Sequence, residues 1–420
     1  LLAILSDILQ AVQRARSDFD HTGAGEMASA IYLDNSASTR VRDEVADAMR
    51  PYLTEKWGNP SSIHAYGREA QMAIAAARQQ VAKLLNCQPE EIYFSPCGTY
   101  SNNVAILGRA RFAEANDQGR HLITTPIEHS SVNGPVKHLE ACGWKVTYLP
   151  VDREGFVKPG DLEKAITRET SIISIMWANN EVGTLEPIAE LAAIAASAGV
   201  YFHTDAVQTA GKLPIDLSTV PVSALSISGH KFHAPKGIGA LFVRRSVNVM
   251  PLVFGGGQEH GLFPGTEGLA NIVAIGKAAE LAGEEMDTNL SRMRRLQDIL
   301  SDRLSRVPGI KFTGAEQPDK RVPGHVSVLV PGSDGETLVM KSDLKGVSIS
   351  SGSACRQGIV EPSRIVLALG WPQDEALGSA RISAGRFNTE EECTRAADLL
   401  AQVFAAVQES AGACGKVTAS

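Results

Sequence analysis

The stretch "SISGHKFHAPKGIGAL", residues 226–241, follows a short apolar run and places Lys231 between His230 and Phe232. A lysine at the end of an apolar strand is either a solvated strand-end charge or a desolvated amine that takes part in chemistry. Most lysines in globular proteins stay exposed, so Lys231 by itself favours the first interpretation. The other residues of the chain must decide between the two.

The composition is that of an ordinary globular protein. The chain has 420 residues, of which 44% are hydrophobic and 21% charged, and this length allows two domains or one domain with a lobe. A net charge of −7 argues against nucleic acid as a partner, because no basic excess is present to neutralise phosphates. We find no apolar stretch long enough to span a bilayer and therefore expect no membrane partner.

The cysteines indicate reduced thiols and a cytoplasmic protein, since no CxxC pair or framework spacing occurs among them. The six positions are Cys87, Cys97, Cys142, Cys355, Cys393 and Cys414. Each is a candidate nucleophile. Residues 1–29 precede the ordered pattern and contain a short amphipathic run followed by a Gly-containing linker. We expect an extension from an upstream start, a fused segment or an accessory helix there.

From about residue 90 onward, short β-rich runs alternate with helical stretches. The runs are "EIYFS" (91–95), "HLITT" (121–125), "KVTYLP" (145–150), "SIISIMW" (171–177), "GVYFHTD" (199–205) and "VSALSIS" (222–228). This alternation predicts an α/β fold with a mostly parallel, doubly wound sheet. After the glycine-rich segment 255–268, we expect a long helical stretch over about 270–306. The last third, with a loop at 348–363, predicts a smaller α+β domain.

Polar residues follow several of these runs, where ligands gather in a doubly wound sheet. Thr99 opens a predicted helix and suits an anion, although a simple helix cap explains it as well. His129 is either a hydrogen-bonded structural residue or a site residue. Asp205 ends another run, with Gln208 three positions on. A carboxylate at such a place needs a cationic or donor partner, which a protonated pyridine nitrogen or an arginine would supply.

Together these residues are the four kinds of group that a site for pyridoxal phosphate needs. They are a lysine able to form an imine, a strand-end carboxylate, a flat histidine ring and an anion-binding helix start. Desolvation and nearby positive charge would lower the pKa of Lys231, so that its amine acts as nucleophile and base. Because all four groups occur in one chain, we interpret Lys231 as a desolvated amine that takes part in chemistry.

Motifs along most of the chain extend this interpretation. They are "YLDNSAST" (32–39), "WGNPSSIHAYGREA" (57–70), "EHSSV" (128–132), "NNEVGT" (179–184), "HTDAVQTAGK" (203–212), "SGHKFHAPKGIGAL" (228–241), "GGGQEHG" (255–261), "SSGSAC" (350–355) and "ARISAGRFNT" (380–389). In this order they resemble the class V, fold-type I pyridoxal phosphate enzymes. More narrowly, the chain is similar to the NifS/IscS-like cysteine desulfurases from about Ile31 to about Leu400.

The resemblance implies a role for each matching residue. Lys231 would be the Schiff-base lysine. The cofactor ring would be held by His129 stacked on it, Asp205 at its pyridinium nitrogen and Gln208 at its phenolic oxygen. The phosphate would be bound by the backbone of Gly98 and by Thr99, Ser228 and His230, with Thr266 contributed by the neighbouring subunit of a homodimer. The substrate carboxylate would be bound by Asn180 and Arg381, whose guanidinium fork suits a carboxylate.

Cys355 would be the persulfide cysteine. Its segment "SSGSACRQG" (350–358) is rich in serine and glycine, so we expect an exposed, mobile loop. The implied reaction removes sulfur from L-cysteine and leaves L-alanine and a persulfide on Cys355. The sulfur would then pass to an acceptor or an iron–sulfur scaffold protein.

The expected domain organisation follows from the same resemblance. Residues 30–45 would join the small domain, residues 46–269 would form the large cofactor-binding domain, and residues 270–420 would form the small domain with the Cys355 loop. Two alternatives stay open: another class V enzyme (a selenocysteine lyase, a cystine lyase or an aminotransferase), or a catalytically weak scaffold relative. Cys355 argues against the first, and the intact Lys231 site argues against the second.

The chain leaves the family pattern at a few positions. The family usually has glutamate where Tyr100 stands, glycine where Cys97 stands, and arginine where His260 and Phe263 stand. One hypothesis is a paired replacement, in which Tyr100 and Phe263 of opposite subunits form an aromatic contact instead of an ion pair. Two unrelated surface changes are the alternative. The replacement also raises the prospect of weak or specialised desulfurase activity.

Overall fold

The computed structural model describes residues 30–352, 354–356 and 359–417. Seven strands form the main sheet in the order β2-β8-β7-β6-β5-β3-β4. Their bounds are β2 (Ile92–Ser95), β3 (His121–Thr124), β4 (Lys145–Tyr148), β5 (Thr170–Ser174), β6 (Tyr201–Asp205), β7 (Ala224–Ser228) and β8 (Gly239–Val243). Strands β3 to β7 are parallel to one another, and β8 is antiparallel to both β2 and β7. The predicted α/β class with a mostly parallel sheet is confirmed.

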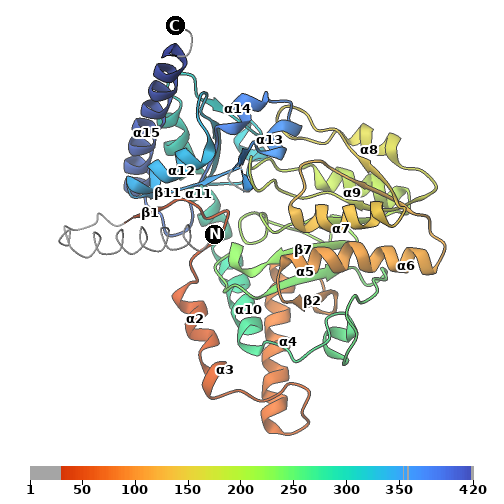
Figure 1. Ribbon diagram of the computed structural model, residues 1–420. Coiled ribbons are helices and arrows are strands. Elements are labelled where there is room, and N and C mark those ends of the chain that lie inside the picture. Colours follow the sequence, from red (N-terminus) through yellow and green to blue (C-terminus); the bar gives the residue numbers. More distant parts are fainter. Residues whose placement is uncertain (1–29, 353, 357–358, 418–420) are drawn as a thin grey trace, which may run out of the picture.

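Helices cover both faces of this sheet, because successive strand residues point to opposite sides. Ile123 and Phe202 belong to the core on one face, and their neighbours Leu122 and Tyr201 belong to the core on the other. The first face carries α4 (Ala65–Leu85), α8 (Pro159–Ala165), α9 (Ile188–Ser197) and α10 (Leu269–Glu284). The second carries α5 (Gly98–Asn103), a π-helical turn (Val104–Gly108), α6 (Arg109–Ala115) and α7 (Ser130–Ala141). Both layers are visible in Figure 1.

A second sheet has its own core. It contains β12 (Ser350–Ser351), β15 (Ser379–Ser383), β10 (His325–Leu329) and β9 (Lys311–Phe312), all antiparallel. Near it β1 (Ile31–Tyr32) runs parallel to β11 (Val347–Ser348). The remaining helices are α2 (Asp43–Met49), α3 (Pro51–Thr54), α11 (Met286–Leu304), α12 (Gly335–Leu344), α13 (Arg364–Ala368), α14 (Gln373–Leu377) and α15 (Glu390–Val417). In Figure 1 the second sheet, α12 and α15 lie at the upper left. The domain boundaries given above remain predictions.

Two predicted segments differ from the structure. The helical stretch near 270–306 is two helices, because the chain leaves the helical conformation at Glu285, whose carboxylate pairs with Arg42 and Arg386. The segment expected to be a loop includes β12 at the edge of the second sheet and the antiparallel strands β13 (Ala354–Arg356) and β14 (Ile359–Glu361). A serine-rich strand that adds to an existing sheet edge carries no hydrophobic alternation to reveal it.

Within the described residues, no helix combines the length and the apolar character needed to cross a membrane.

Candidate active site

Lys231 is placed by a short 3-10 turn, Gly229–Lys231, that directly follows β7. The backbone packs tightly at this point. A Cβ atom at Gly239 would lie 2.8 Å from the Cys97 carbonyl carbon, and one at Gly98 would lie 3.2 Å from the Ser228 Cβ. The glycines therefore let β8 and the start of α5 approach the end of β7, which brings Lys231 close to the helix start.

A cavity of about 330 Å³ lies at this place. Ten of the twelve predicted site residues line it: Gly98, Thr99, His129, Asn180, Asp205, Gln208, Ser228, His230, Lys231 and Arg381. They come from strand ends and helix starts of the main sheet, apart from Asn180 in a loop after β5 and Arg381 on β15. Thr266 instead lines a second cavity, which Thr99 also lines. The Cys355 side chain lies outside the described part of the chain.

The Lys231 amine is held by backbone carbonyls. Its Nζ donates hydrogen bonds to Ser36 O at 2.6 Å and Ala37 O at 2.9 Å. Burial, assisted by the positive charge of Arg381, lowers the pKa of Lys231 to about 8, against the opposing effect of Asp205. A neutral amine is therefore accessible at mildly alkaline pH, as a nucleophile or base requires.

A hydrogen-bond network joins Asp205 to His129. The Asp205 carboxylate accepts from Asn102 Nδ2 at 2.7 Å and from the Val207 N–H at 3.0 Å. Asn102 also donates to Ser131 Oγ, which lies 2.7 Å from His129 Nδ1. That nitrogen accepts the Ser131 N–H, and burial lowers the pKa of His129. The imidazole is therefore neutral, with its proton on Nε2.

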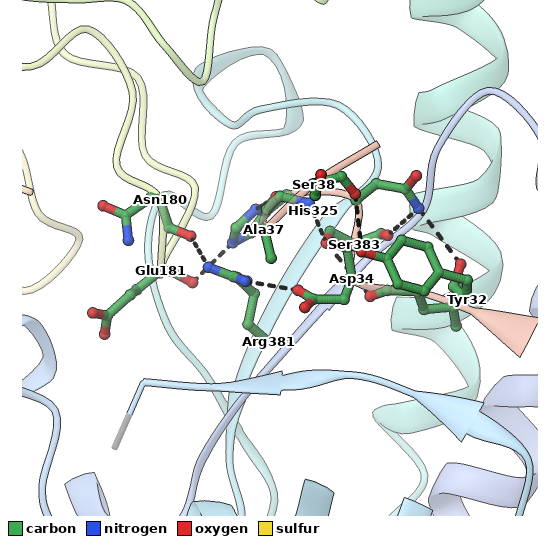
Figure 2. Close-up of polar contacts among 12 residues, drawn as sticks. Tyr32, Asp34, Ala37, Ser38, Asn180, Glu181, His325, Arg381 and Ser383 are labelled. Carbon is green, nitrogen blue, oxygen red and sulfur yellow. Dashed lines mark hydrogen bonds and ion pairs between the residues drawn. The ribbon is translucent and has the colours of Figure 1, made fainter. Parts of the chain in front are cut away.

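Arg381 is anchored on two sides, as Figure 2 shows. Its Nη2 donates to Asp34 Oδ1 at 2.7 Å, and its Nη1 donates to the Asn180 carbonyl at 2.8 Å. Among the described residues, Arg381 Nε and Asn180 Oδ1 are buried without a hydrogen-bond partner. Because buried polar atoms are seldom left unpaired, these two atoms indicate that a polar ligand completes this end of the cavity.

Several site residues were missed by sequence reasoning. Asn102 carried a detectable signal, since it lies four residues after Gly98 and therefore on the same helix face. Asp34 and Ser36 belong to the quoted motif 32–39, but nothing local connects them to Arg381 or Lys231, which lie far away in the sequence.

Two of the four positions that leave the family pattern, Tyr100 and Phe263, lie at the second cavity, which has a volume of about 800 Å³. Tyr100, Phe263 and Thr266 all line it, and the Tyr100 side chain is 51% exposed. The His260 ring meets Tyr93 edge to face, with 5.9 Å between the ring centroids. A contact between Tyr100 and Phe263 of opposite subunits requires a second chain and remains a prediction, as does the role of Thr266.

Comparisons with known proteins identify the family of the chain. The family model for aminotransferase class-V matches residues 31–395. A cysteine desulfurase IscS of Dictyoglomus turgidum is 44% identical over 375 residues, which cover 89% of this chain and 94% of the relative. A cysteine desulfurase IscS of Methanosarcina thermophila is 44% identical over 387 residues, covering 91% and 95%. A solved structure of a NifS-like protein, 38% identical, superposes with a TM-score of 0.83 over 89% of this chain and 99% of that one.

The family model and the similar proteins identify the class of enzymes to which this sheet and cavity belong. The chain belongs to the class-V aminotransferase family and, within it, to the IscS- and NifS-like group.

Proposed function

We propose that the cavity around Lys231 binds pyridoxal 5′-phosphate, and that Lys231 holds it covalently. Asp205 supports this fit. It is buried, its hydrogen-bond partners are the amides of Asn102 and Val207, and no cationic side chain pairs with it among the described residues. A buried carboxylate without a cation is costly, and the protonated ring nitrogen of this cofactor would supply the missing charge. When bound, the cofactor would accept the electrons released at the substrate α-carbon.

The protein is a cysteine desulfurase, in agreement with the sequence-based prediction, since curated relatives with this activity match about nine tenths of the chain. We propose that Arg381 and Asn180 bind the substrate carboxylate and that the Lys231 amine removes the α-proton. The Cys355 thiolate then attacks the substrate sulfur, whose bond to the β-carbon breaks. L-cysteine and a thiol thereby give L-alanine and a persulfide, and atoms and electrons balance without an external oxidant.

The observation that carries this proposal is the Lys231 amine, whose pKa is lowered to about 8 in a cavity with Asp205 and Arg381. The cofactor assignment is tested by borohydride reduction of the reconstituted protein, followed by peptide mass spectrometry. We expect the reduced cofactor on the peptide that contains Lys231. A reduced cofactor on another lysine, or none, would overturn the assignment.

A substrate panel separates the alternative activities. Alanine from L-cysteine, with little product from L-cystine or from an amino acid and a 2-oxo acid, supports the desulfurase. A preference for L-selenocysteine or for cystine would instead favour one of the related lyases. Absence of any turnover in a protein that binds the cofactor would favour the scaffold alternative.

Arg381 supplies a prediction for substrate binding. Arg381→Lys should raise the KM for L-cysteine by about 10-fold or more, because the loss of a charged hydrogen bond costs about 1.5–3 kcal/mol, while the absorption of the bound cofactor persists. Steady-state kinetics measures the effect. Arg386→Lys is the matched control, since Arg386 pairs with Glu285 outside the cavity. Equal KM changes in both variants would contradict the assignment.

We further propose a cytoplasmic homodimer that delivers sulfur to an acceptor or iron–sulfur scaffold protein. Sedimentation of the purified protein should give a dimer. In a double-mutant cycle of Tyr100→Ala and Phe263→Ala, the dimer dissociation energies should show a coupling of about 0.5–1.5 kcal/mol, as expected for a contacting aromatic pair. Additive effects of the two substitutions would mean that the rings do not meet.

A further inference from the structure

Lys212, the last residue of the motif 203–212, is a cation that the proposed reaction does not use. It is partly buried and lines a small cavity of about 60 Å³ that Lys231 also lines. The only hydrogen bond described for its Nζ is to Gln208 Oε1, at 2.9 Å. Within the described ranges no carboxylate pairs with it.

The electrostatic surroundings of Lys212 are unfavourable to its charge. The titratable groups coupled to its ammonium are Lys231, Arg381, His230, His233 and His325. None of them carries negative charge. Burial, followed by the charges of Lys231 and Arg381, lowers the pKa of Lys212 to about 7. An apolar side chain would avoid this cost. The interaction that Lys212 makes here is the hydrogen bond from its Nζ to Gln208 Oε1.

The hydrogen bond from Lys212 helps to fix the orientation of the Gln208 side-chain amide. The amide of Gln208 is held at both ends: its Oε1 accepts from Lys212, and its Nε2 donates to Ser36 O at 2.8 Å. A lysine ammonium can only donate and a backbone carbonyl can only accept. If the Gln208 amide were flipped, its Nε2 would face the Lys212 donor and its Oε1 would face the Ser36 carbonyl, and both hydrogen bonds would be lost. Nε2 has a second N–H, and Gln208 lines the cavity next to Lys231.

We infer that Lys212 is a positioning residue that holds the Gln208 amide nitrogen as a donor toward the phenolic oxygen of the cofactor. The inference rests on the proposed function, because it requires pyridoxal phosphate in the cavity. Above the pKa of Lys212 its neutral amine can both donate and accept, and the Ser36 carbonyl, which only accepts, then keeps the Gln208 nitrogen as the donor.

A donor at the phenolic oxygen has a measurable consequence. While the nitrogen that joins Lys231 to the cofactor is protonated, its proton stabilises the negative charge of that oxygen. After this proton leaves, the negative charge of the oxygen would be stabilised by the hydrogen bond that the protein donates. The Gln208 N–H therefore favours the deprotonated form and lowers the pH at which the visible absorption of the bound cofactor changes.

The test is a pH titration of this absorption in the holoenzyme. In Lys212→Met the midpoint should rise by about 0.7 pH unit, since one neutral hydrogen bond is worth about 1 kcal/mol. Gln208→Leu should raise the midpoint at least as much. Lys212→Met added to Gln208→Leu should cause no further shift. Lys212→Arg, which keeps a donor, should stay near the wild-type midpoint and serves as a second variant if the methionine variant does not fold.

The outcomes that overturn the inference are specific. An unchanged midpoint in Lys212→Met would refute the inference. A rise in Lys212→Arg as large as the rise in Lys212→Met would also refute it. An equal shift from Lys212→Met with and without Gln208 would show that the lysine acts through its charge alone. A wild-type protein without any cofactor absorption would instead refute the proposed function, so the two failures are distinguishable.

Discussion

Lys231→Ala should remove both the visible absorption of the bound cofactor and desulfurase turnover. The substitution deletes the amine that holds the cofactor and, in the proposal, also the base that takes the α-proton. General base catalysis alone contributes about 10²–10⁴-fold, so alanine release should fall by about a thousandfold or more. Absorption spectra and single-turnover assays for alanine measure the two effects separately.

Lys236→Ala is the matched control for this prediction. Lys236 belongs to the same motif, is exposed and does not line the cavity. Its substitution should leave the spectrum and alanine release close to those of the wild type. Unchanged alanine release in Lys231→Ala would show that another group performs the proton transfer, and the site would have to be assigned again.

Cys355→Ser should stop persulfide formation while cofactor binding persists. A serine hydroxyl is not a thiolate at neutral pH and does not attack the substrate sulfur. We expect an unchanged spectrum before substrate is added, and a loss of alanine release of about a hundredfold or more. Intact-protein mass spectrometry after one turnover should find one added sulfur atom on the wild type and none on the variant.

Cys142→Ser provides the comparison, because Cys142 is an exposed free thiol within the described residues. It should carry no substrate sulfur, and its loss should not affect turnover. Labile sulfur on Cys355→Ser, or its disappearance from Cys142→Ser, would identify another cysteine as the carrier.

Much of the fold could be predicted because the main sheet is buried on both faces. Its strands β3, β5, β6 and β7 lie in short β-rich runs that alternate with helical stretches, and that pattern is local. Strand β8 was not identified, since glycines at 237 and 239 interrupt the pattern at its start. At the break between α10 and α11, Glu285 pairs with Arg42 and Arg386, and no local pattern contains these contacts.

The candidate site also contains residues that could be predicted from the sequence and residues that could not. Asp205 and Lys231 could be identified from the residues alone, because each follows an apolar run at a strand end. Arg381 and Asn180 depended on the family resemblance. The Asp34–Arg381 ion pair joins residues separated by 347 positions. A backbone bridge between Asp34 and Ser383 sets the segment after β1 beside β15, which carries Arg381, and no local pattern predicts this pairing. The partners of Gln208 likewise come from two segments, one near residue 36 and one near residue 212.

The most direct test of the desulfurase account is a single reaction of the purified holoenzyme with L-cysteine and a thiol reductant, in which alanine and sulfide are both quantified over time. We expect equal amounts of the two products, because each substrate molecule leaves one alanine and one persulfide sulfur that the reductant releases. Sulfide without alanine, or alanine without sulfide, would contradict it.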